Sequence, residues 1–116
     1  DAGESWRFLT KGLHAHYLRA VAPGQDAVFV TASTGPHGGR AAVYRGAPCP
    51  GGSFERCTKG LPEWFEGNID TGRLAASGPH VAFGTEEGTV YVSEDDGRQW
   101  SLLARGLAEV RGVALA

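Results

Sequence analysis

Ser-Glu-Asp-Asp-Gly-Arg-Gln-Trp, at residues 93–100, is the stretch that decides the fold, because it belongs to a pattern that the chain repeats. Residues 100–107, which begin at the tryptophan of this stretch, align without a gap to residues 6–13 and 54–61. The three segments are spaced by 48 and then by 46 residues. Three copies at nearly constant spacing indicate an internal repeat. The sequence therefore predicts a protein built from similar units.

The length of the repeat indicates what the unit is. A period of about 40 to 50 residues, with short strands and glycine turns, is typical of β-propeller blades, which are four-stranded antiparallel sheets. Apolar alternation bounded by Gly, Pro, Asp and Asn marks short strands, and no segment has the pattern of a long helix. We therefore predict an all-β fold with strands at 6–9, 17–22, 27–32, 40–45, 53–58, 73–77, 80–84, 89–93, 99–104 and 110–116.

These strands divide the chain into two complete blades and two incomplete ones. We expect the end of a preceding blade at 1–13, a first full blade at 14–61, a second full blade at 62–107, and the inner strand of a further blade at 108–116. A closed propeller needs about four or more blades. The orphan outer strand and the orphan inner strand would leave backbone groups unpaired. We therefore expect the remaining blades of a larger propeller, of which this would be the C-terminal part, or another chain, to cover them.

Charge and hydropathy exclude several classes of partner. The 116 residues carry 11 basic and 13 acidic side chains without a run of one sign, which is no footprint for nucleic acid or an anionic membrane. No stretch approaches the roughly 18 consecutive apolar residues of a membrane helix. Because residue 1 already lies inside a repeat, a targeting segment cannot be assessed. We expect no nucleic acid, no membrane and no cofactor as partners.

Cys49 and Cys57 are the only cysteines, and they flank a tight turn that would bring two strand ends together. A disulfide across this loop would stabilise the fold by about 2.6 kcal/mol and would favour an oxidising compartment, secreted or periplasmic. Two free thiols on neighbouring strands are the alternative. A zinc site is not expected, because a second pair of ligands is missing.

The residues of the 93–100 turn have clear physical roles. Asp95 is expected to accept hydrogen bonds from backbone amides of its own turn, and Gly97 to supply a positive φ. Trp100 would bury a large apolar surface and donate its indole N–H. A calcium loop that uses Glu94, Asp95 and Asp96 is the less favoured alternative, because the alternating ligands and the terminal bidentate Glu are missing.

This turn resembles the Asp-box, or BNR, repeat of sialidases, sortilin-type receptors, xyloglucan-degrading propellers, and photosystem II assembly factors and related bacterial proteins. The resemblance spans essentially the whole chain. The first copy is truncated, and the middle copy departs from the pattern with Ala47, Cys49 and Phe54, although Gly51 is kept. The resemblance implies a structural turn on the face away from the binding site, formed here by Ser93, Asp95, Gly97, Trp100, Asp1, Gly3 and Trp6.

A ligand site is expected on the rim opposite these turns, where loops 12–17, 33–39, 60–72 and 85–88 would emerge together. The segment 61–70 is longer than its equivalent after Leu107, and insertions on a rim often carry function. Trp64 could stack on a sugar or anchor a protein, or it could fold back with Phe65 as a hydrophobic lid. The rim candidates are Trp64, Phe65, Glu66, Asp70, His14, His16 and His37, with Glu86 and Glu87 nearby. The three histidines could bind a metal, but solvated or hydrogen-bonded loop histidines are favoured.

A catalytic set is not evident in these residues. The resemblance to sialidases implies a Tyr nucleophile, three arginines around a carboxylate and an Arg-Ile-Pro segment, and neither that segment nor a convincing Tyr/Glu pair occurs. Tyr17, Tyr44 and Tyr91 fall inside predicted strands. We therefore expect a non-catalytic scaffold that binds a glycan or a protein on the rim. The alternatives are a glycoside hydrolase whose catalytic residues lie in other blades, and a structural fragment that self-associates to complete a propeller.

Overall fold

The computed structural model describes residues 2–6, 8–47 and 52–116. These residues contain strands and no helix, so the described chain has no helix that could cross a membrane. The strands are β1 (Tyr17–Pro23), β2 (Val28–Ser33), β3 (Ala42–Gly46), β4 (Phe54–Arg56), β5 (Leu74–Ser77), β6 (His80–Gly84), β7 (Val90–Ser93) and β8 (Ser101–Ala104).

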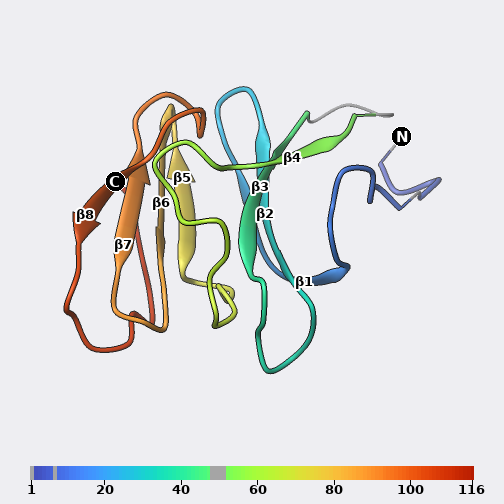
Figure 1. The fold of residues 1–116 in the computed structure, drawn as a ribbon. Helices are drawn as coiled ribbons and strands as arrows, with labels where there is room; N and C mark the ends of the chain where they lie inside the picture. The colour runs from blue at the N-terminus through green and yellow to red at the C-terminus, as the bar shows by residue number, and fades with distance from the viewer. Residues whose placement is uncertain (1, 7, 48–51) are drawn as a thin grey trace.

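The strands form two four-stranded antiparallel sheets that stand side by side (Figure 1). Sheet 1 has the order β1-β2-β3-β4 and sheet 2 has the order β5-β6-β7-β8. Each strand therefore pairs with its neighbour in the chain, which is the connectivity that short turns favour. The prediction of an all-β fold with two four-stranded antiparallel sheets is confirmed, and each predicted inner and outer strand of these sheets lies within a few residues of an observed one.

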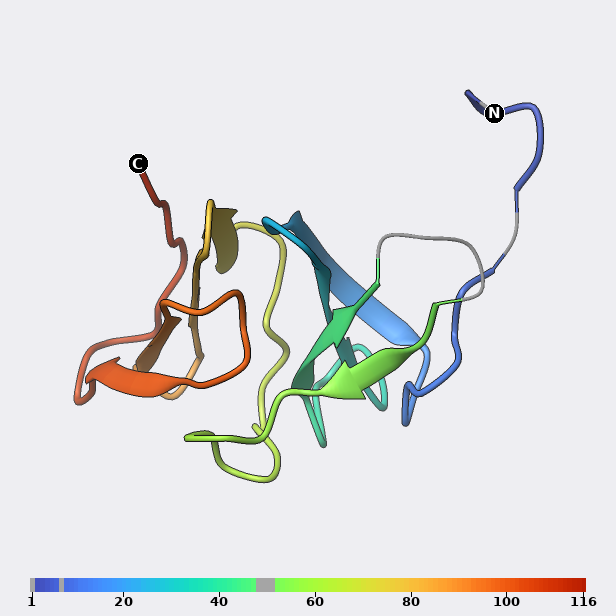
Figure 2. The ribbon, with the colours of Figure 1, turned by 90° about the horizontal axis from the view of Figure 1, so that it is seen from above.

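The predicted strands at the two ends of the chain differ from the structure. Residues 6, 8 and 9 and residues 110–116 belong to no strand. The C-terminal segment lies along sheet 2, where the amide of Val110 donates to Thr85 O (3.1 Å) and that of Val113 donates to Gly72 O (2.7 Å). Figure 2 shows that the two ends lie on opposite sides of the molecule. A strand exists only beside a neighbour that completes its ladder, and neither end has a full ladder among the described residues.

The two sheets pack through unlike faces. Val43 of sheet 1 shares the main buried cluster with Leu74 and Phe83 of sheet 2. Tyr44, the next residue after Val43, points to the other side of sheet 1 and belongs to a separate cluster. Tyr91 of sheet 2 has the same place in its sheet as Tyr44, since Tyr44 pairs with Val30 and Tyr91 with Phe83, but Tyr91 packs against sheet 1. The two sheets therefore follow one another with the same orientation, and the Tyr44 side of sheet 1 is covered by Leu13, Phe54 and Trp64.

Large apolar side chains fill the space between the sheets. Phe29 of sheet 1 and Phe83 of sheet 2 are fully buried there. Burial of one such side chain stabilises a fold by roughly 1.5–3 kcal/mol. Ile69 and Trp100, which lie outside the strands, complete the same cluster. The connections between strands therefore contribute to the core as well as the strands themselves.

Candidate functional site

The hairpin turn between β7 and β8 is held by hydrogen bonds to its own side chains. Ser93 Oγ donates to Asp95 Oδ1 (2.8 Å). Asp95 Oδ1 accepts the amide protons of Arg98 (3.1 Å) and Gln99 (2.9 Å). The amide of Gln99, the Ser93 hydroxyl and the amide of Arg98 together hold the pKa of Asp95 below its ordinary value. Asp95 thus has the role of a turn carboxylate that the sequence suggests.

Gly97 and Trp100 close the same turn against the core. Gly97 has a φ of 81°, and its amide donates to Ser93 Oγ (2.9 Å). A Cβ at this position would lie 2.2 Å from the ring of Phe29 in sheet 1. The Trp100 indole donates to Gly97 O (3.1 Å), and its ring meets Phe83 at a centroid distance of 5.2 Å. A glycine is therefore required at residue 97 both by the backbone and by the neighbouring sheet.

Asp96, the residue between these two, ties sheet 2 to sheet 1. It is buried with a φ of 59°, and its carboxylate accepts the amide protons of Gln25 and Asp26 at 3.1 Å each. The same carboxylate lies 3.1 Å from Arg45 Nη2, and the Asp96 carbonyl accepts Arg45 Nε–H at 2.8 Å. This role could not be predicted from the sequence, because the three partners lie 51 to 71 residues away along the chain.

The neighbouring carboxylates do not converge on a cation. Asp95 turns into its own hairpin and Asp96 turns into sheet 1. The described part of the chain holds no group of three or more His, Cys, Asp or Glu side chains placed for a metal ion. Nothing in the geometry of the turn favours the calcium alternative.

Cys57 is half-buried against the cluster between the sheets, and it forms no disulfide with a described residue. Burial raises its pKa to about 12, against smaller opposite effects from Trp100 and Arg45. Cys49 and the rest of the predicted turn at 48–51 lie outside the described residues, and so does Asp1. The disulfide between the two cysteines therefore stays a prediction.

At the opposite end of the sheets, three of the predicted rim loops meet (Figure 1). The amide of Gly39 donates to Glu66 O (2.6 Å), which joins the β2–β3 loop to the segment between the sheets. Asn68 Nδ2 donates to Gly35 O and to Pro36 O, both at 3.1 Å. Glu87, from the β6–β7 loop, accepts the amide of Glu66 at 3.1 Å. Segment 62–70 is thus the element that links the loops of both sheets.

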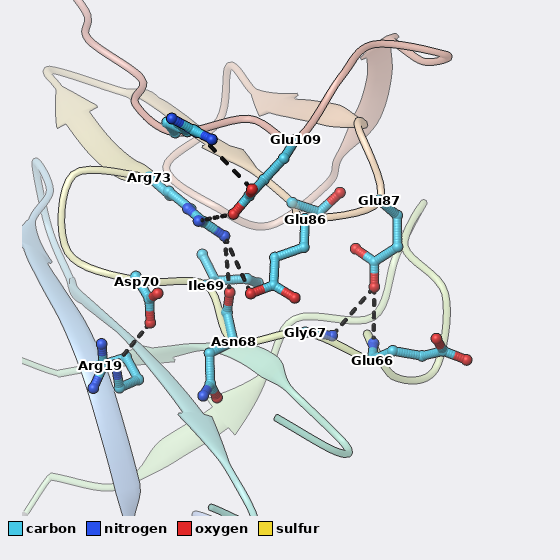
Figure 3. A network of polar contacts seen from close by, with 12 residues as sticks. Arg19, Glu66, Gly67, Asn68, Ile69, Asp70, Arg73, Glu86, Glu87 and Glu109 are labelled. Atoms are coloured by element: carbon cyan, nitrogen blue, oxygen red, sulfur yellow. Dashed lines mark hydrogen bonds and ion pairs between the residues drawn. The ribbon is translucent and has the colours of Figure 1, made fainter. Parts of the chain in front are cut away.

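Glu87 is fixed by backbone amides. Its Oε1 accepts the amide protons of Glu66 (3.1 Å) and Gly67 (3.2 Å), as Figure 3 shows. Partial burial acts to raise the pKa of Glu87, but hydrogen bonds from its own amide, from Gly67, from the Thr85 hydroxyl and from Glu66 outweigh it and lower the pKa. The ionised carboxylate is therefore the form that holds the rim together.

Arg73 organises a second set of polar contacts on the rim. Its side chain is largely buried, and it reaches Glu109 Oε1 at 2.6 Å and Glu86 Oε1 at 3.7 Å. Its Nη1 also donates to Asn68 O (3.4 Å). Figure 3 shows these partners around the Arg73 guanidinium, with the pair of Asp70 and Arg19 (2.7 Å) nearby. Arg73 and Glu109 were not among the predicted site residues.

Phe65 and Trp64 point to opposite sides of the rim segment. The backbone of Phe65 exchanges two hydrogen bonds of 2.8 Å with Ala41, so residues 64 and 65 are extended. The Phe65 ring is buried between the sheets, 5.4 Å from the Phe83 ring and 5.7 Å from the Tyr91 ring. Phe65 is therefore part of the core.

Trp64 is half-buried against the Tyr44 cluster of sheet 1, and its ring lies among cationic groups. The guanidinium carbon of Arg56 is 4.2 Å from the centroid of the Trp64 ring, and that of Arg40 is 5.9 Å away. The His14 ring lies at a centroid distance of 4.5 Å. Arg40 has a φ of 46°, a backbone conformation that costs energy for a residue with a Cβ. The structure thus gathers an aromatic ring and two arginines from three different segments.

The three predicted histidines do not form a cluster of ligands. His14 Nδ1 makes a short contact with the Tyr44 hydroxyl, and its Nε2 lies 2.7 Å from Arg40 O, so both ring nitrogens have protein partners. His16 and His37 are exposed and take part in no ion pair with a described residue. The hydrogen-bonded role is the one that the structure supports for His14.

A small hollow lies next to Trp64. Its volume is about 250 Å³, and its walls are Pro62, Trp64, Phe65, Glu66, Glu87, Thr89 and Tyr91. Aromatic walls with a few polar groups are typical of sites for small ligands. The hollow and the cationic surface around Trp64 together form the candidate site.

No protein-family model, no curated protein and no solved structure matches the chain. The resemblance to Asp-box repeats therefore depends on the residues of the turn and on their hydrogen bonds.

Proposed function

We propose that the two sheets are successive blades of an Asp-box β-propeller, and that the protein is a non-catalytic binding module. Two features support the fold assignment: the hydrogen bonds of the 93–100 turn, and the identical orientation of the two sheets. A propeller needs such a head-to-tail succession, whereas a sandwich buries the inner faces of both its sheets against each other.

The ligand binds on the rim opposite the 93–100 turn, at the surface around Trp64. The observation that carries this proposal is the pair of arginines beside the ring. Arg40 and Arg56 lie over Trp64, and neither forms an ion pair with a described carboxylate. Guanidinium groups bind carboxylates and phosphates through paired N–H donors.

A glycan with an acidic group fits this surface best. The adjacent hollow of about 250 Å³ has Trp64 and Tyr91 in its wall beside the carboxylates of Glu66 and Glu87. The sugar ring would lie in this hollow, with its acidic group turned away from the two carboxylates and toward Arg40 and Arg56. The arginine at 4.2 Å already occupies part of the Trp64 surface. Binding would therefore require the Arg56 side chain to turn from the indole toward the acidic group.

The contacts of the rim carboxylates favour binding over hydrolysis. Asp70 pairs with Arg19, Glu86 lies beside Arg73, and Glu87 accepts backbone amides. A glycosidase acid needs a carboxyl group that stays protonated near neutral pH. The pKa of Glu87 is lowered instead, which supports a structural role for this group.

A glycan array with and without acidic sugars tests the proposal. We expect the wild type to bind acidic glycans, and Trp64→Ala and Arg56→Gln to lose at least tenfold in affinity. Phe8→Ala is the matched control, because Phe8 is a fully exposed aromatic outside the rim. Unchanged binding by Trp64→Ala would remove this surface from the site. Retention of a protein from a binding screen, with no glycan bound, would replace the glycan by a protein ligand.

A further inference from the structure

A second hollow lies on the other side of β4 from Trp64. Its volume is about 270 Å³, and it lies between the end of β4 and the 93–100 turn. Successive residues of a strand point to opposite faces of the sheet. Arg56 points to the Trp64 side, so Glu55 and its cross-strand neighbour Arg45 point to the side of sheet 2. This side of β4 forms one wall of the second hollow.

The walls of the second hollow are mainly cationic. The basic residues that line it are Arg45, Arg56, Lys59 and Arg98, and Glu55 is the one carboxylate among the described lining residues. Glu55 is exposed and forms no ion pair with a described cation. It therefore offsets one positive charge of the hollow and leaves the others.

Arg45 supplies hydrogen-bond donors at a fixed position. Its Nε–H donates to Asp96 O at 2.8 Å, and its Nη2 lies 3.1 Å from the Asp96 carboxylate. Its Nη1 donates to no described residue, and the side chain is 27% exposed. Because the guanidinium is planar, the contacts with Asp96 also fix the direction of the unused N–H groups. Asp96 neutralises the charge of Arg45, so this residue contributes donors and little net charge.

Lys59 and Arg98 bring positive charge to the hollow from two different sheets. The carbonyl of Lys59, in the turn after β4, accepts the amide of Trp100 at 2.9 Å. Arg98 belongs to the hairpin of sheet 2, where its Nη1 donates to Asp95 O at 3.0 Å. Both side chains are exposed, and neither forms an ion pair with a described carboxylate. The contact between the two turns therefore holds two unpaired cations beside one hollow.

Arg56 connects this hollow with the Trp64 surface. It lines the hollow, and its guanidinium carbon lies 4.2 Å from the centroid of the Trp64 ring. Because β4 is the last strand in the order of sheet 1, no further strand of the sheet separates the two surfaces. Arg40 lies on the Trp64 side of β4 and Lys59 on the other side. One ligand can therefore reach cations on both sides of a single strand.

We infer that the ligand is an oligosaccharide with acidic groups at more than one position, and that its second acidic group binds between Arg45, Lys59 and Arg98. This inference rests on the proposed binding of an acidic glycan at Trp64. Guanidinium forks and ammonium groups bind carboxylates and sulfates alike, so the acidic groups are of either kind. An isolated ion pair at an exposed position contributes little to affinity. Two linked contacts bind more tightly than either does alone, because the second forms within the same complex.

Isothermal titration calorimetry with two lengths of glycan tests the inference. The probes are a disaccharide with one acidic group and a tetrasaccharide with two, each in a carboxylated and a sulfated form. We expect the wild type to bind one form of the tetrasaccharide about tenfold more tightly than its disaccharide. Lys59→Gln and Arg98→Gln should each weaken tetrasaccharide binding about threefold, which is typical of exposed ion pairs, and leave disaccharide binding unchanged. Glu55→Gln should strengthen tetrasaccharide binding, because it removes the opposing charge.

Arg105→Gln is the matched control, because Arg105 is an exposed arginine that lines neither hollow. It should bind both probes like the wild type. The double variant of Lys59 and Arg98 should also show a smaller dependence of Kd on salt concentration than Arg105→Gln does, because fewer counterions are released on binding. Circular dichroism of each variant checks that it is folded.

The outcomes separate this inference from the proposed function. If the disaccharide binds through Trp64 but the tetrasaccharide binds no more tightly, the second hollow is not part of the site, and the proposed function stands. The same holds if the Lys59 and Arg98 variants behave like Arg105→Gln. If neither probe binds, the proposed function itself is wrong. Equally tight binding of linear polyphosphate with the same number of charges would show a general surface for anions in place of a glycan site.

Discussion

Asp96 is expected to be the most important polar residue between the two sheets, and Asp96→Gly isolates its side chain. Glycine accepts the φ of 59° without strain, so the change removes the carboxylate and leaves the backbone conformation accessible. The carboxylate has three contacts of 3.1 Å, to the amides of Gln25 and Asp26 and to Arg45. Hydrogen bonds to a charged group contribute about 1.5–3 kcal/mol each, and water can replace part of this around Arg45. We therefore expect a loss of about 3 kcal/mol.

Urea and thermal unfolding measure this loss. A change of about 3 kcal/mol corresponds to a fall in Tm of about 10 °C for a chain of this size. Asp96→Asn keeps one acceptor oxygen and should lose about half as much. Glu94→Ala is the matched control, because Glu94 is an exposed acid of the same turn, and it should stay within about 0.5 kcal/mol of the wild type. If Asp96→Gly were as stable as Glu94→Ala, the assigned role of Asp96 would be wrong.

A double-mutant cycle separates the ion pair from the amide contacts. Arg45→Met removes the guanidinium that lies 3.1 Å from Asp96 and keeps most of the side-chain volume. The coupling energy between Asp96→Gly and Arg45→Met should be about 1–2 kcal/mol, which is the range for residues in direct polar contact. Additive effects would show that Arg45 stabilises the junction through its own packing.

Further predictions concern the rim, the turn and the thiol. Phe65→Ala should lower the free energy of unfolding by about 3–4 kcal/mol, as measured by urea unfolding, because it removes a buried ring. Trp64→Ala should lower it by much less, because Trp64 is only half-buried. Equal losses would contradict the placement of the two rings on opposite sides of the segment. Because the pKa of Asp95 is lowered in the folded state, its ionised form stabilises the fold at pH values above the ordinary pKa of 3.8, and this contribution is lost as the pH falls through the lower folded-state pKa. Asp95→Asn should therefore flatten the pH dependence of the free energy of unfolding in that range. An unchanged pH profile would argue against this role of Asp95. In a Cys49→Ser variant, Cys57 should react slowly with a thiol reagent, because its pKa is about 12 in the folded protein against an ordinary 9.0. We expect labelling of the folded protein to be about 10³-fold slower than that of the unfolded chain. Rapid labelling under native conditions would refute the burial of Cys57.

The sequence was sufficient to predict the local structure. Apolar alternation and glycine turns located the strands, because a strand is recognised by its own residues and its flanking turns. Asp95, Gly97 and Trp100 form contacts within their own turn, so their roles follow from residue type and short spacing. The same rules predicted strands at the two ends of the chain, where the structure has none. A local sequence pattern does not show whether a neighbouring strand is present to complete the hydrogen-bond ladder.

Contacts between segments that are far apart in the chain could not be predicted from local sequence patterns. Asp96 and Arg45 are 51 residues apart, and Arg73 and Glu109 are 36 residues apart. The contact of Asp96 with Arg45 depends on how sheet 2 is placed on sheet 1, and that of Arg73 with Glu109 depends on where the C-terminal segment lies along sheet 2. Neither placement can be read from the spacing of residues in the sequence. The alternation at Trp64 and Phe65 could have signalled that the two rings point to opposite sides, had segment 62–70 been taken as extended. The segment is extended at this point, because Phe65 pairs with Ala41.

The connection through Asp96 has a consequence for how the chain melts. The corner between β1 and β2 is completed by a residue from the last hairpin, so the first sheet loses part of its own support as soon as the second one opens. Repeat arrays with weak boundaries unravel from their ends, whereas strongly coupled neighbours melt as one block. We expect a single heat-absorption peak for this chain, and amide exchange at Gln25 that reports the opening of a hairpin seventy residues further along the sequence.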